Sequence, residues 1–252
     1  MIELENISLR LGEGKEQSEI LKRISLTFET GKLYVITGPN GGGKTSVAKV
    51  IMGIYQPDAG NIYDDGEDIT ALSITERSKR GIRYAFQAPP RFKGIDIGRF
   101  LRLASPASQE PQIRSHMRQI GLCPEDYLGR FADSGLSGGE MKRVEVASVL
   151  LGPTRVAILD EPEAGVDLWG FDEMLKMVLR SHAQTQERTT IIISHSEKFL
   201  EAADEIIVMA QGQVQERGKM AQIRPFIEAG IHCRWRKMCA EGEDLDAAQC
   251  SR

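Results

Sequence analysis

Polar and apolar residues alternate in two stretches near the start of the chain, which is the period-two pattern of a half-buried β-strand. Residues 2–11 and 20–28 both follow it, and we expect these two strands to pair. The next segment, 33–37, is apolar throughout, as is typical of a strand buried in a parallel sheet. A glycine-rich loop follows, and apolar residues then return at helical spacing (Val47, Val50, Ile51 and Ile54). This stretch is therefore predicted to form a strand, a loop and a helix.

The middle of the chain changes character. Ser73 and Glu76 have the spacing of a capping box that starts a helix over 74–80, and a short strand is predicted over 82–86. Residues of about 88–134 begin with proline and glycine and continue with helical periodicity in two stretches, 97–103 and 112–120. We expect this segment to form a mostly helical subdomain inserted into the main domain.

The α/β pattern resumes at Ser137. Strands and helices are predicted to alternate there and to end in a hairpin: a strand over 155–160, a helix over 167–181, a strand over 189–194, a helix over 197–203, and paired strands over 205–209 and 213–216. Together with the earlier segments, this order indicates an α/β fold with a parallel sheet.

Composition narrows the class of protein. Of 252 residues, 41% are hydrophobic and 27% charged, as in an ordinary globular protein, and the net charge of −4 does not favour nucleic acid as a partner. No apolar run approaches the length of a membrane span, and the N-terminus lacks the features of a signal peptide. We expect a cytoplasmic protein without direct membrane insertion. Residues 1–230 are predicted to form one domain, followed by a polar tail, 231–252, that carries Cys233, Cys239 and Cys250.

The loop after the third strand, GPNGGGKT, fits the phosphate-binding pattern G-x-x-x-x-G-K-[ST]. Glycines let the main chain approach a phosphate closely, and a helix start presents free N–H groups to its oxygens. Lys44 would add a positive charge near the β- and γ-phosphates, and Thr45 would offer a hydroxyl to Mg²⁺. An ordinary glycine turn is the alternative, which the strand–loop–helix order disfavours. We predict an ATP site formed by Gly38, Pro39, Asn40, Gly41, Gly42, Gly43, Lys44, Thr45 and Ser46.

A second acidic element follows the apolar strand at 155–160. Asp160 and Glu161 come at its carboxyl end, and ligands bind at that edge of a parallel sheet. Asp160 is predicted to hold Mg²⁺, directly or through water, and Glu161 to orient the attacking water and accept its proton. A solvated acidic turn is the alternative, which a phosphate loop in the same chain makes less favourable.

The segment Leu136–Glu140 reads LSGGE and precedes an apolar helical run. Ser137 and Glu140 have capping-box spacing, and Gly138 and Gly139 leave exposed N–H groups at the positive end of the helix. Such a helix start suits a γ-phosphate. Since the chain already has one phosphate loop, we predict that this start faces ATP held by a second copy, so that ATP would join two copies.

Two further polar residues follow predicted strands. Gln87 could touch the metal or the attacking water and sense the γ-phosphate, and His195 could contact the γ-phosphate and the water. A surface glutamine and a structural histidine are the alternatives for these two positions.

These residues occur in the order found in ABC-type ATPases, which the sequence resembles over about residues 1–220. Gly38–Thr45, Gln87, Leu136–Glu140, Ile158–Glu161, 164–167 and His195 resemble the Walker A, Q-loop, signature, Walker B, D-loop and H-loop motifs. The resemblance implies a P-loop core with an antiparallel β subdomain and an inserted helical subdomain. It also implies ATP and Mg²⁺ as cofactors, Gln87 as a metal contact, a role for Asp167 at the nucleotide, and a head-to-tail dimer with two ATPs.

Among ABC-type ATPases, three stretches are similar to the SufC family, the ATPases of the SUF iron–sulfur cluster assembly system. They are the segments AFQAP at 85–89, SGGEMKR at 137–143 and DEPEAGVD at 160–167. This resemblance implies a SufB/SufD-like scaffold as the partner, remodelled by ATP-driven closure and opening. The alternative is the nucleotide-binding subunit of a membrane transporter. A DNA-repair ATPase is disfavoured because no coiled coil or zinc module interrupts 44–160.

The sequence departs from the family pattern at three points. Leu11 stands near the place where an aromatic residue often stacks on adenine, which puts base stacking in doubt and leaves apolar contacts for the base. Ala164 replaces the usual serine and Val166 the usual leucine of the D-loop. The cysteine-bearing tail does not map onto the SufC family, and its spacing does not match a zinc finger.

Overall fold

The computed structural model describes residues 1–12, 17–133 and 135–228. The N-terminal strands form an antiparallel four-stranded sheet in the order β2-β1-β4-β5, with β1 (Ile2–Leu11), β2 (Ser18–Phe28), β4 (Ala59–Asp64) and β5 (Glu67–Asp68). In the register, Ile2 lies opposite Phe28 and Leu4 opposite Leu26, so the apolar positions of both strands share one face. The predicted pairing of the first two strands is confirmed.

The second sheet has six strands in the order β10-β9-β3-β8-β7-β6. All neighbours are parallel except β9 and β10, which form the predicted hairpin. The strands are β3 (Leu33–Thr37), β6 (Ile82–Ala85), β7 (Val156–Asp160), β8 (Thr189–Ile193), β9 (Glu205–Ala210) and β10 (Gln213–Gly218).

Both faces of the six-stranded sheet are buried, which explains its continuous apolar strands. In β3, Tyr34 and Ile36 pack into a core shared with the four-stranded sheet and α1 (Lys44–Met52), whereas Leu33 and Val35 pack into a second core on the opposite face. That second core is built with α6 (Gly138–Leu151), α7 (Leu168–Gln184) and α8 (Glu197–Ala202).

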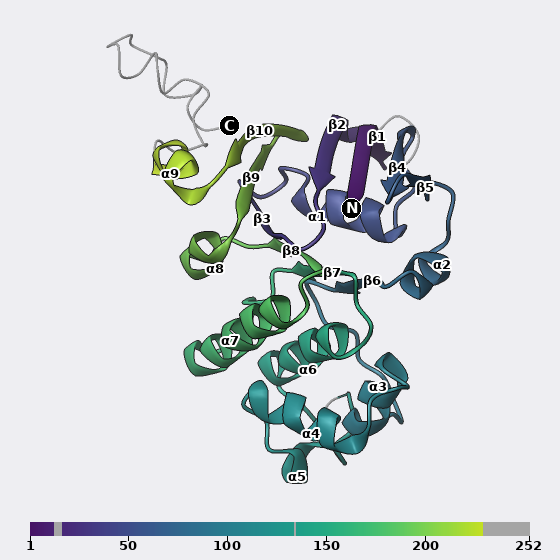
Figure 1. Cartoon of the computed structure of the whole chain (residues 1–252), viewed down its shortest axis with the longest axis vertical. Coiled ribbons are helices and arrows are strands. Elements are labelled where there is room, and N and C mark those ends of the chain that lie inside the picture. Colours follow the sequence, from purple (N-terminus) through teal and green to yellow (C-terminus); the bar gives the residue numbers. More distant parts are fainter. Residues whose placement is uncertain (13–16, 134, 229–252) are drawn as a thin grey trace.

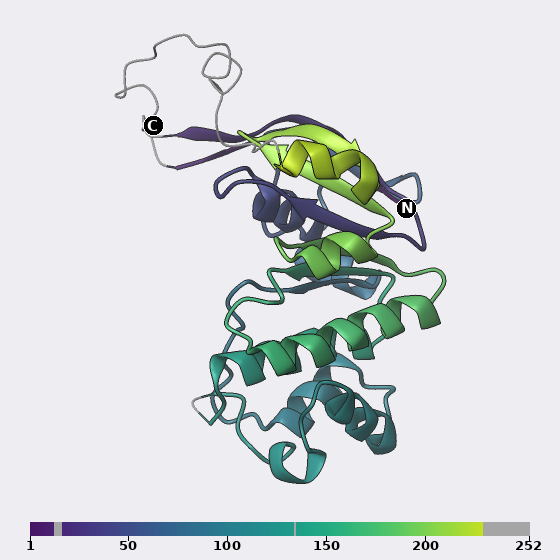
Figure 2. The same cartoon turned by 90° about the vertical axis from the view of Figure 1, so that its left-hand side faces the viewer.

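The inserted segment is helical, as predicted. It leaves the sheet after β6 and forms α3 (Ile97–Ala104), α4 (Glu110–Gln119) and α5 (Pro124–Tyr127) before α6 leads back to β7. These helices gather at one end of the molecule, with α6 and α7 between them and the sheets (Figures 1 and 2). Their buried residues, Leu101 and Met117 among them, join the same core as α6, which fixes the insertion against the domain.

One helix lies between β5 and β6, and another follows β10, where its Ile223 joins the second core. The capping box of Ser73 and Glu76 starts α2 (Ile74–Lys79), as predicted. A ninth helix of the described chain, α9 (Met220–Glu228), was not predicted, and it contains Pro225. The predictions for the cysteine-bearing tail, 231–252, concern residues outside those that the structure describes.

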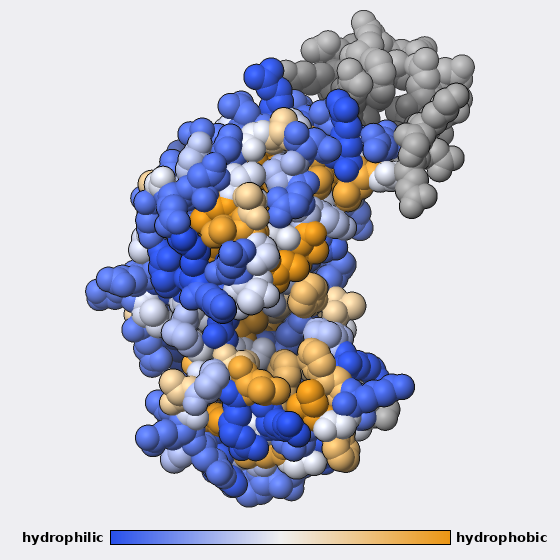
Figure 3. All heavy atoms as spheres, turned by 90° about the vertical axis from the view of Figure 1, so that its right-hand side faces the viewer, coloured by the Kyte–Doolittle hydropathy of each residue, from blue (hydrophilic) through white to orange (hydrophobic). Residues whose placement is uncertain are grey.

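The face of the molecule drawn in Figure 3 is mainly polar. On the face drawn in Figure 3, apolar side chains form separate patches among hydrophilic ones. Among the described residues, no helix combines the length and the hydrophobicity that crossing a bilayer would require.

Candidate nucleotide-binding site

The glycine loop connects β3 to α1 and presents the start of that helix. Gly38 has φ of 129°, and a Cβ there would lie 2.0 Å from the carbonyl oxygen of Met209, so only glycine fits where the loop crosses β9. Gly43, with φ of 96°, occupies the N-cap of α1. Serine or aspartate side chains cap α2, α6 and α7, whereas no side chain caps α1. The first N–H groups of α1 are therefore left for an anion.

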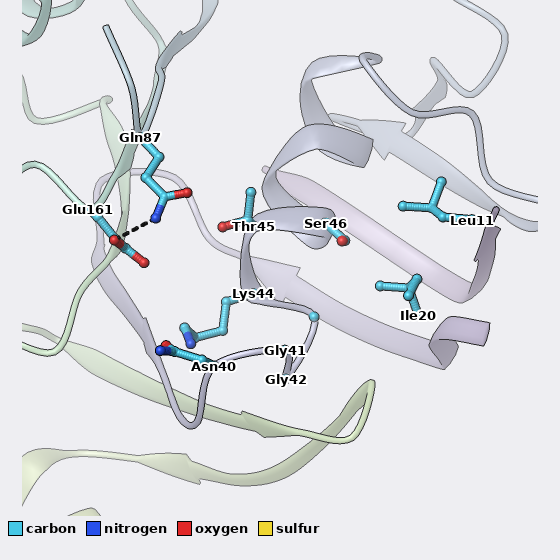
Figure 4. A pocket seen from close by; sticks show the side chains of 11 residues that line it. Leu11, Ile20, Asn40, Gly41, Gly42, Lys44, Thr45, Ser46, Gln87 and Glu161 are labelled. Carbon is cyan, nitrogen blue, oxygen red and sulfur yellow. Dashed lines mark hydrogen bonds between the residues drawn. The ribbon is translucent and has the colours of Figure 1, made fainter. Parts of the chain in front are cut away.

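A pocket of about 360 Å³ lies beside this helix start. Leu11 and Ile20 stand together at one end, and Gln87 and Glu161 stand at the other (Figure 4). One end of the pocket is thus apolar and the other polar, as a site for a base and a phosphate chain needs. Its lining consists of Leu11, Ile20, Asn40, Gly41, Gly42, Gly43, Lys44, Thr45, Ser46, Gln87 and Glu161.

Lys44 is held inside the loop by main-chain acceptors. Its Nζ donates to the carbonyl oxygens of Gly38 at 2.7 Å and Pro39 at 2.9 Å, and the side chain is buried. Burial lowers the pKa of Lys44, and the nearby carboxylates of Glu161 and Asp160 oppose that shift. The site therefore combines a fixed cation with carboxylates across the pocket.

Asp160 ends β7 and is almost fully buried. Its Oδ1 accepts from Thr45 Oγ1 at 3.1 Å, and its Oδ2 accepts from Tyr84 Oη at 2.6 Å. Burial raises the pKa of the Asp160 carboxyl, and these two hydrogen bonds act against the rise. The hydroxyl of Thr45 and the carboxylate of Asp160 are the oxygen ligands that Mg²⁺ prefers, so this donor set fits the predicted metal.

Glu161 follows directly and adopts φ of 45°, a left-handed conformation that costs a residue with a side chain about 1–3 kcal/mol. Its main-chain N–H donates to the carbonyl oxygen of Ile193 at 2.9 Å, which holds this turn against β8. The Glu161 Oε2 accepts from Gln87 Nε2 at 2.8 Å (Figure 4). The structure thus joins two predicted catalytic residues that are far apart in sequence.

His195 follows β8 and does not line the pocket. Its main-chain N–H donates to Glu163 Oε1 at 3.2 Å, and Ser194 Oγ donates to the same oxygen at 2.5 Å. Desolvation, followed by the positive charge of Lys44, lowers the pKa of His195, which favours the neutral imidazole at neutral pH. Glu163 therefore ties the His195 turn to the loop after Glu161.

Comparison with known proteins identifies the family. A family model described as "ABC transporter" matches residues 21–164. The chain is 37% identical over 217 residues to an uncharacterised ABC transporter ATP-binding protein of Methanocaldococcus jannaschii, covering 82% of this chain and 86% of that protein. This chain belongs to the ATP-binding cassette family. The cassette is an ATPase, and its cofactors are ATP and Mg²⁺.

Two further likenesses agree with this assignment. The cassette is 32% identical over 216 residues to a probable ATP-dependent transporter, ycf16, of Cyanidium caldarium, covering 79% of this chain and 84% of the other. Its fold matches that of a solved dimeric ATP-binding cassette in a post-hydrolysis state with ADP and phosphate, with a TM-score of 0.78 at 20% identity over 87% of this chain and 99% of that chain. The predicted cassette fold is confirmed.

Other predicted residues of the cassette lie away from the pocket. Ser137 caps α6, accepting from the N–H of Glu140 at 3.2 Å, and both Ser137 and Gly138 are exposed. Asp167 caps α7 through the N–H of Gly170 at 2.9 Å. A single chain therefore brings neither Ser137–Gly139 nor Asp167 into the pocket lining.

Sequence reasoning did not single out four residues that shape the site. Ile20 completes the apolar end of the pocket, Tyr84 bonds to Asp160, and Lys142 and Glu145 of α6 reach the segment that begins with Phe86. Ile20 and Tyr84 had been assigned only to strands, Lys142 had been named only as part of the SGGEMKR segment, and Glu145 lies in a run noted for its apolar positions. Their roles depend on contacts between distant segments, which spacing along the chain does not reveal.

Proposed function

We propose that this cassette hydrolyses ATP as a two-fold symmetric dimer, in which each Mg·ATP lies between the phosphate loop of one copy and Ser137–Gly139 of the other. The observation that carries this proposal is the separation of the two predicted phosphate-binding elements within one chain. The start of α6 is exposed and outside the pocket that contains Lys44. A second copy, turned head to tail, would bring it to the nucleotide.

The residues of the pocket have distinct roles in this proposal. The N–H groups at the start of α1 and the ammonium of Lys44 hold the phosphates, and Thr45, Asp160 and Gln87 hold Mg²⁺, which neutralises phosphate charge when bound. Water attacks the γ-phosphorus, the bond to the ADP oxygen breaks, and Glu161 accepts the proton of the water. Neutral His195 contacts the γ-phosphate side of the site.

Replacing the proposed base tests this reaction and the dimer together. Glu161→Gln keeps the shape of the side chain and removes its basicity, so the rate constant of hydrolysis should fall about 10²- to 10⁴-fold with ATP binding retained. Light scattering should detect a dimer of this variant in saturating Mg·ATP and a monomer without nucleotide. Glu187→Gln, at an exposed carboxylate far from the pocket, is the control. A Glu161→Gln protein that binds ATP fully and stays monomeric would refute the dimer.

We further propose that the partner driven by this dimer is a SufB/SufD-like scaffold for iron–sulfur cluster assembly. The support is the similarity of the AFQAP, SGGEMKR and DEPEAGVD segments to the SufC family. Glu140, where many transporter subunits carry glutamine, closes the capping box by accepting from Ser137 N at 2.7 Å and also accepts from Tyr127 Oη at 2.5 Å. Purification of the native complex with mass spectrometry should recover a scaffold that binds iron and sulfide.

A transporter membrane subunit is the second candidate partner. The observation that favours it is the naming of the relatives described above, which are called an ABC transporter ATP-binding protein and a probable ATP-dependent transporter. In that case the native complex should need detergent for its extraction and should contain a membrane-embedded subunit. Recovery of such a subunit without a scaffold would overturn the assembly proposal and leave the ATPase proposal intact.

A further inference from the structure

Helix α6 places two charged residues in the interior, next to the catalytic loops. Lys142 is 0% exposed and Glu145 is 3% exposed, and the two lie one turn apart on the helix. Both face the chain that leaves β6, where Phe86 leads to Gln87. Charged side chains are rarely buried unless they are paired or hydrogen-bonded, so the groups that bind Lys142 and Glu145 indicate what these residues do.

Lys142 joins the ends of two strands through its ammonium group. Its Nζ donates to the carbonyl oxygens of Phe86, of Gln87 at 3.2 Å and of Asp160 at 2.9 Å. An ammonium has three protons, and here each has a main-chain acceptor. One side chain of α6 thereby holds the first residues of the Gln87 segment and the last residue of β7 in a fixed relation.

Glu145 holds the same segment from its other side. Its Oε1 accepts from the main-chain N–H of Phe86 at 2.9 Å, so α6 binds both the N–H and the carbonyl of this residue. Its Oε2 is buried without a hydrogen-bond partner, and it lies 3.9 Å from Lys142 Nζ. Burial raises the pKa of Glu145 to about 7, which shows that a carboxylate at this position is costly. An apolar pair would fill this space at a lower cost in desolvation.

We propose that Lys142 and Glu145 are positioning residues, which fix Gln87 so that its amide meets Glu161, and that α6 conveys to them the contact made at its Ser137 end. The inference rests on the proposed function, because it takes Ser137 to meet the nucleotide of the second copy. Movement of α6 on closure then shifts the Phe86–Gln87 segment and the end of β7 as one unit. The rate of hydrolysis in one copy thus depends on whether the Ser137 end of its own α6 contacts the nucleotide of the second copy.

The test compares two substitutions of Glu145. Glu145→Ala removes the acceptor for the Phe86 N–H, and we expect kcat to fall about 10- to 100-fold, as for small misplacements of catalytic groups, with the Kd for ATP unchanged. Glu145→Gln keeps a carbonyl oxygen for that N–H, so it should restore most of kcat. Ser148→Ala, on the same helix but bonded only to the Glu145 carbonyl, is the matched control. Lys142→Met should lower kcat in the same way as Glu145→Ala.

A second measurement does not depend on activity. Hydrogen exchange of the nucleotide-free protein, followed on a peptide that contains Phe86, should be faster in Glu145→Ala and normal in Glu145→Gln. Because this measurement uses only the Glu145 variants, it still tests the inference if Lys142→Met fails to fold. Wild-type kcat in Glu145→Ala, or equal losses of ATP affinity and kcat, would overturn the inference. So would an equal loss of kcat in Glu145→Gln and Glu145→Ala with normal exchange. If Glu161→Gln does not dimerise, the proposed function fails instead, whatever the Glu145 variants do.

Discussion

The hydroxyl of Tyr84 favours the ionised form of the Asp160 carboxyl against the effect of burial, and Tyr84→Phe isolates that contact. Tyr84 lies on β6 with 8% of its surface exposed, and its Oη donates to Asp160 Oδ2 at 2.6 Å. Phenylalanine keeps the ring, which packs edge-on against Phe86. The substitution therefore removes one hydrogen bond from a buried carboxylate and leaves the packing in place.

The size of the effect follows from the charge of the acceptor. A hydrogen bond to a charged group contributes about 1.5–3 kcal/mol, and 1.36 kcal/mol corresponds to a change of one in a pKa. Loss of the Tyr84 hydrogen bond should therefore raise the pKa of Asp160 by about one to two more. The hydrogen bond favours the ionised form. Loss of the hydrogen bond should thus lower the free energy of unfolding by the whole of its contribution at pH values above the pKa that Asp160 has in the variant. The difference should disappear as the pH falls through the native pKa.

Two assays follow these changes. Thermal unfolding at neutral pH should show a Tm lower by about 3–12 °C for a chain of this length. In the proposed site Mg²⁺ binds the ionised Asp160 carboxylate, so the Mg²⁺ concentration that supports half-maximal ATPase activity should rise in the variant, and more steeply toward acid pH than in the wild type. Tyr34→Phe is the control, since the buried Tyr34 hydroxyl accepts only the neutral Glu29 N–H at 2.8 Å.

The control should lose about 1 kcal/mol of stability, with no change in Mg²⁺ dependence at any pH. The reasoning is refuted if Tyr84→Phe unfolds at the wild-type temperature at neutral pH. It is refuted equally if the two tyrosine variants show the same Mg²⁺ dependence across the pH range. Either result would mean that Asp160 does not depend on Tyr84 for its charge.

Two further predictions concern the phosphates. Lys44→Ala should raise the Kd for ATP about 10- to 100-fold, because it removes a charged hydrogen bond to the phosphates. Equilibrium binding of a fluorescent ATP analogue measures this change. An unchanged affinity would mean that Lys44 does not bind the phosphates. Ser137→Arg should leave ATP binding to the single chain intact and abolish dimer-dependent hydrolysis. Its control is Ser73→Arg, which also loses a capping box, worth about 1 kcal/mol, and should keep full ATPase activity. Equal losses of ATPase activity in the two variants would mean that Ser137 acts only as the N-cap of α6.

The sequence by itself determined the order of strands and helices, the inserted helical segment and the phosphate loop. These features are local: a period of two or of 3.6, a glycine run before a helix, and a capping box such as that of Ser73 are set by residues close together in the chain. The helices α5 and α9 were missed, because a four-residue helix and a short segment interrupted by Pro225 both give a weak periodic signal. The motif residues Lys44, Asp160 and Glu161 could be named from sequence because their spacing is tied to such elements.

Tertiary structure alone decided how these motifs meet. It placed Gln87 on Glu161, Tyr84 on Asp160, and Lys142 and Glu145 on the segment around Phe86. It also kept the start of α6 out of the pocket. Each of these contacts joins segments far apart in the chain, so it depends on strand order and helix packing in three dimensions. Hydrogen bonds form only within about 3 Å, and no pattern along a sequence measures that distance.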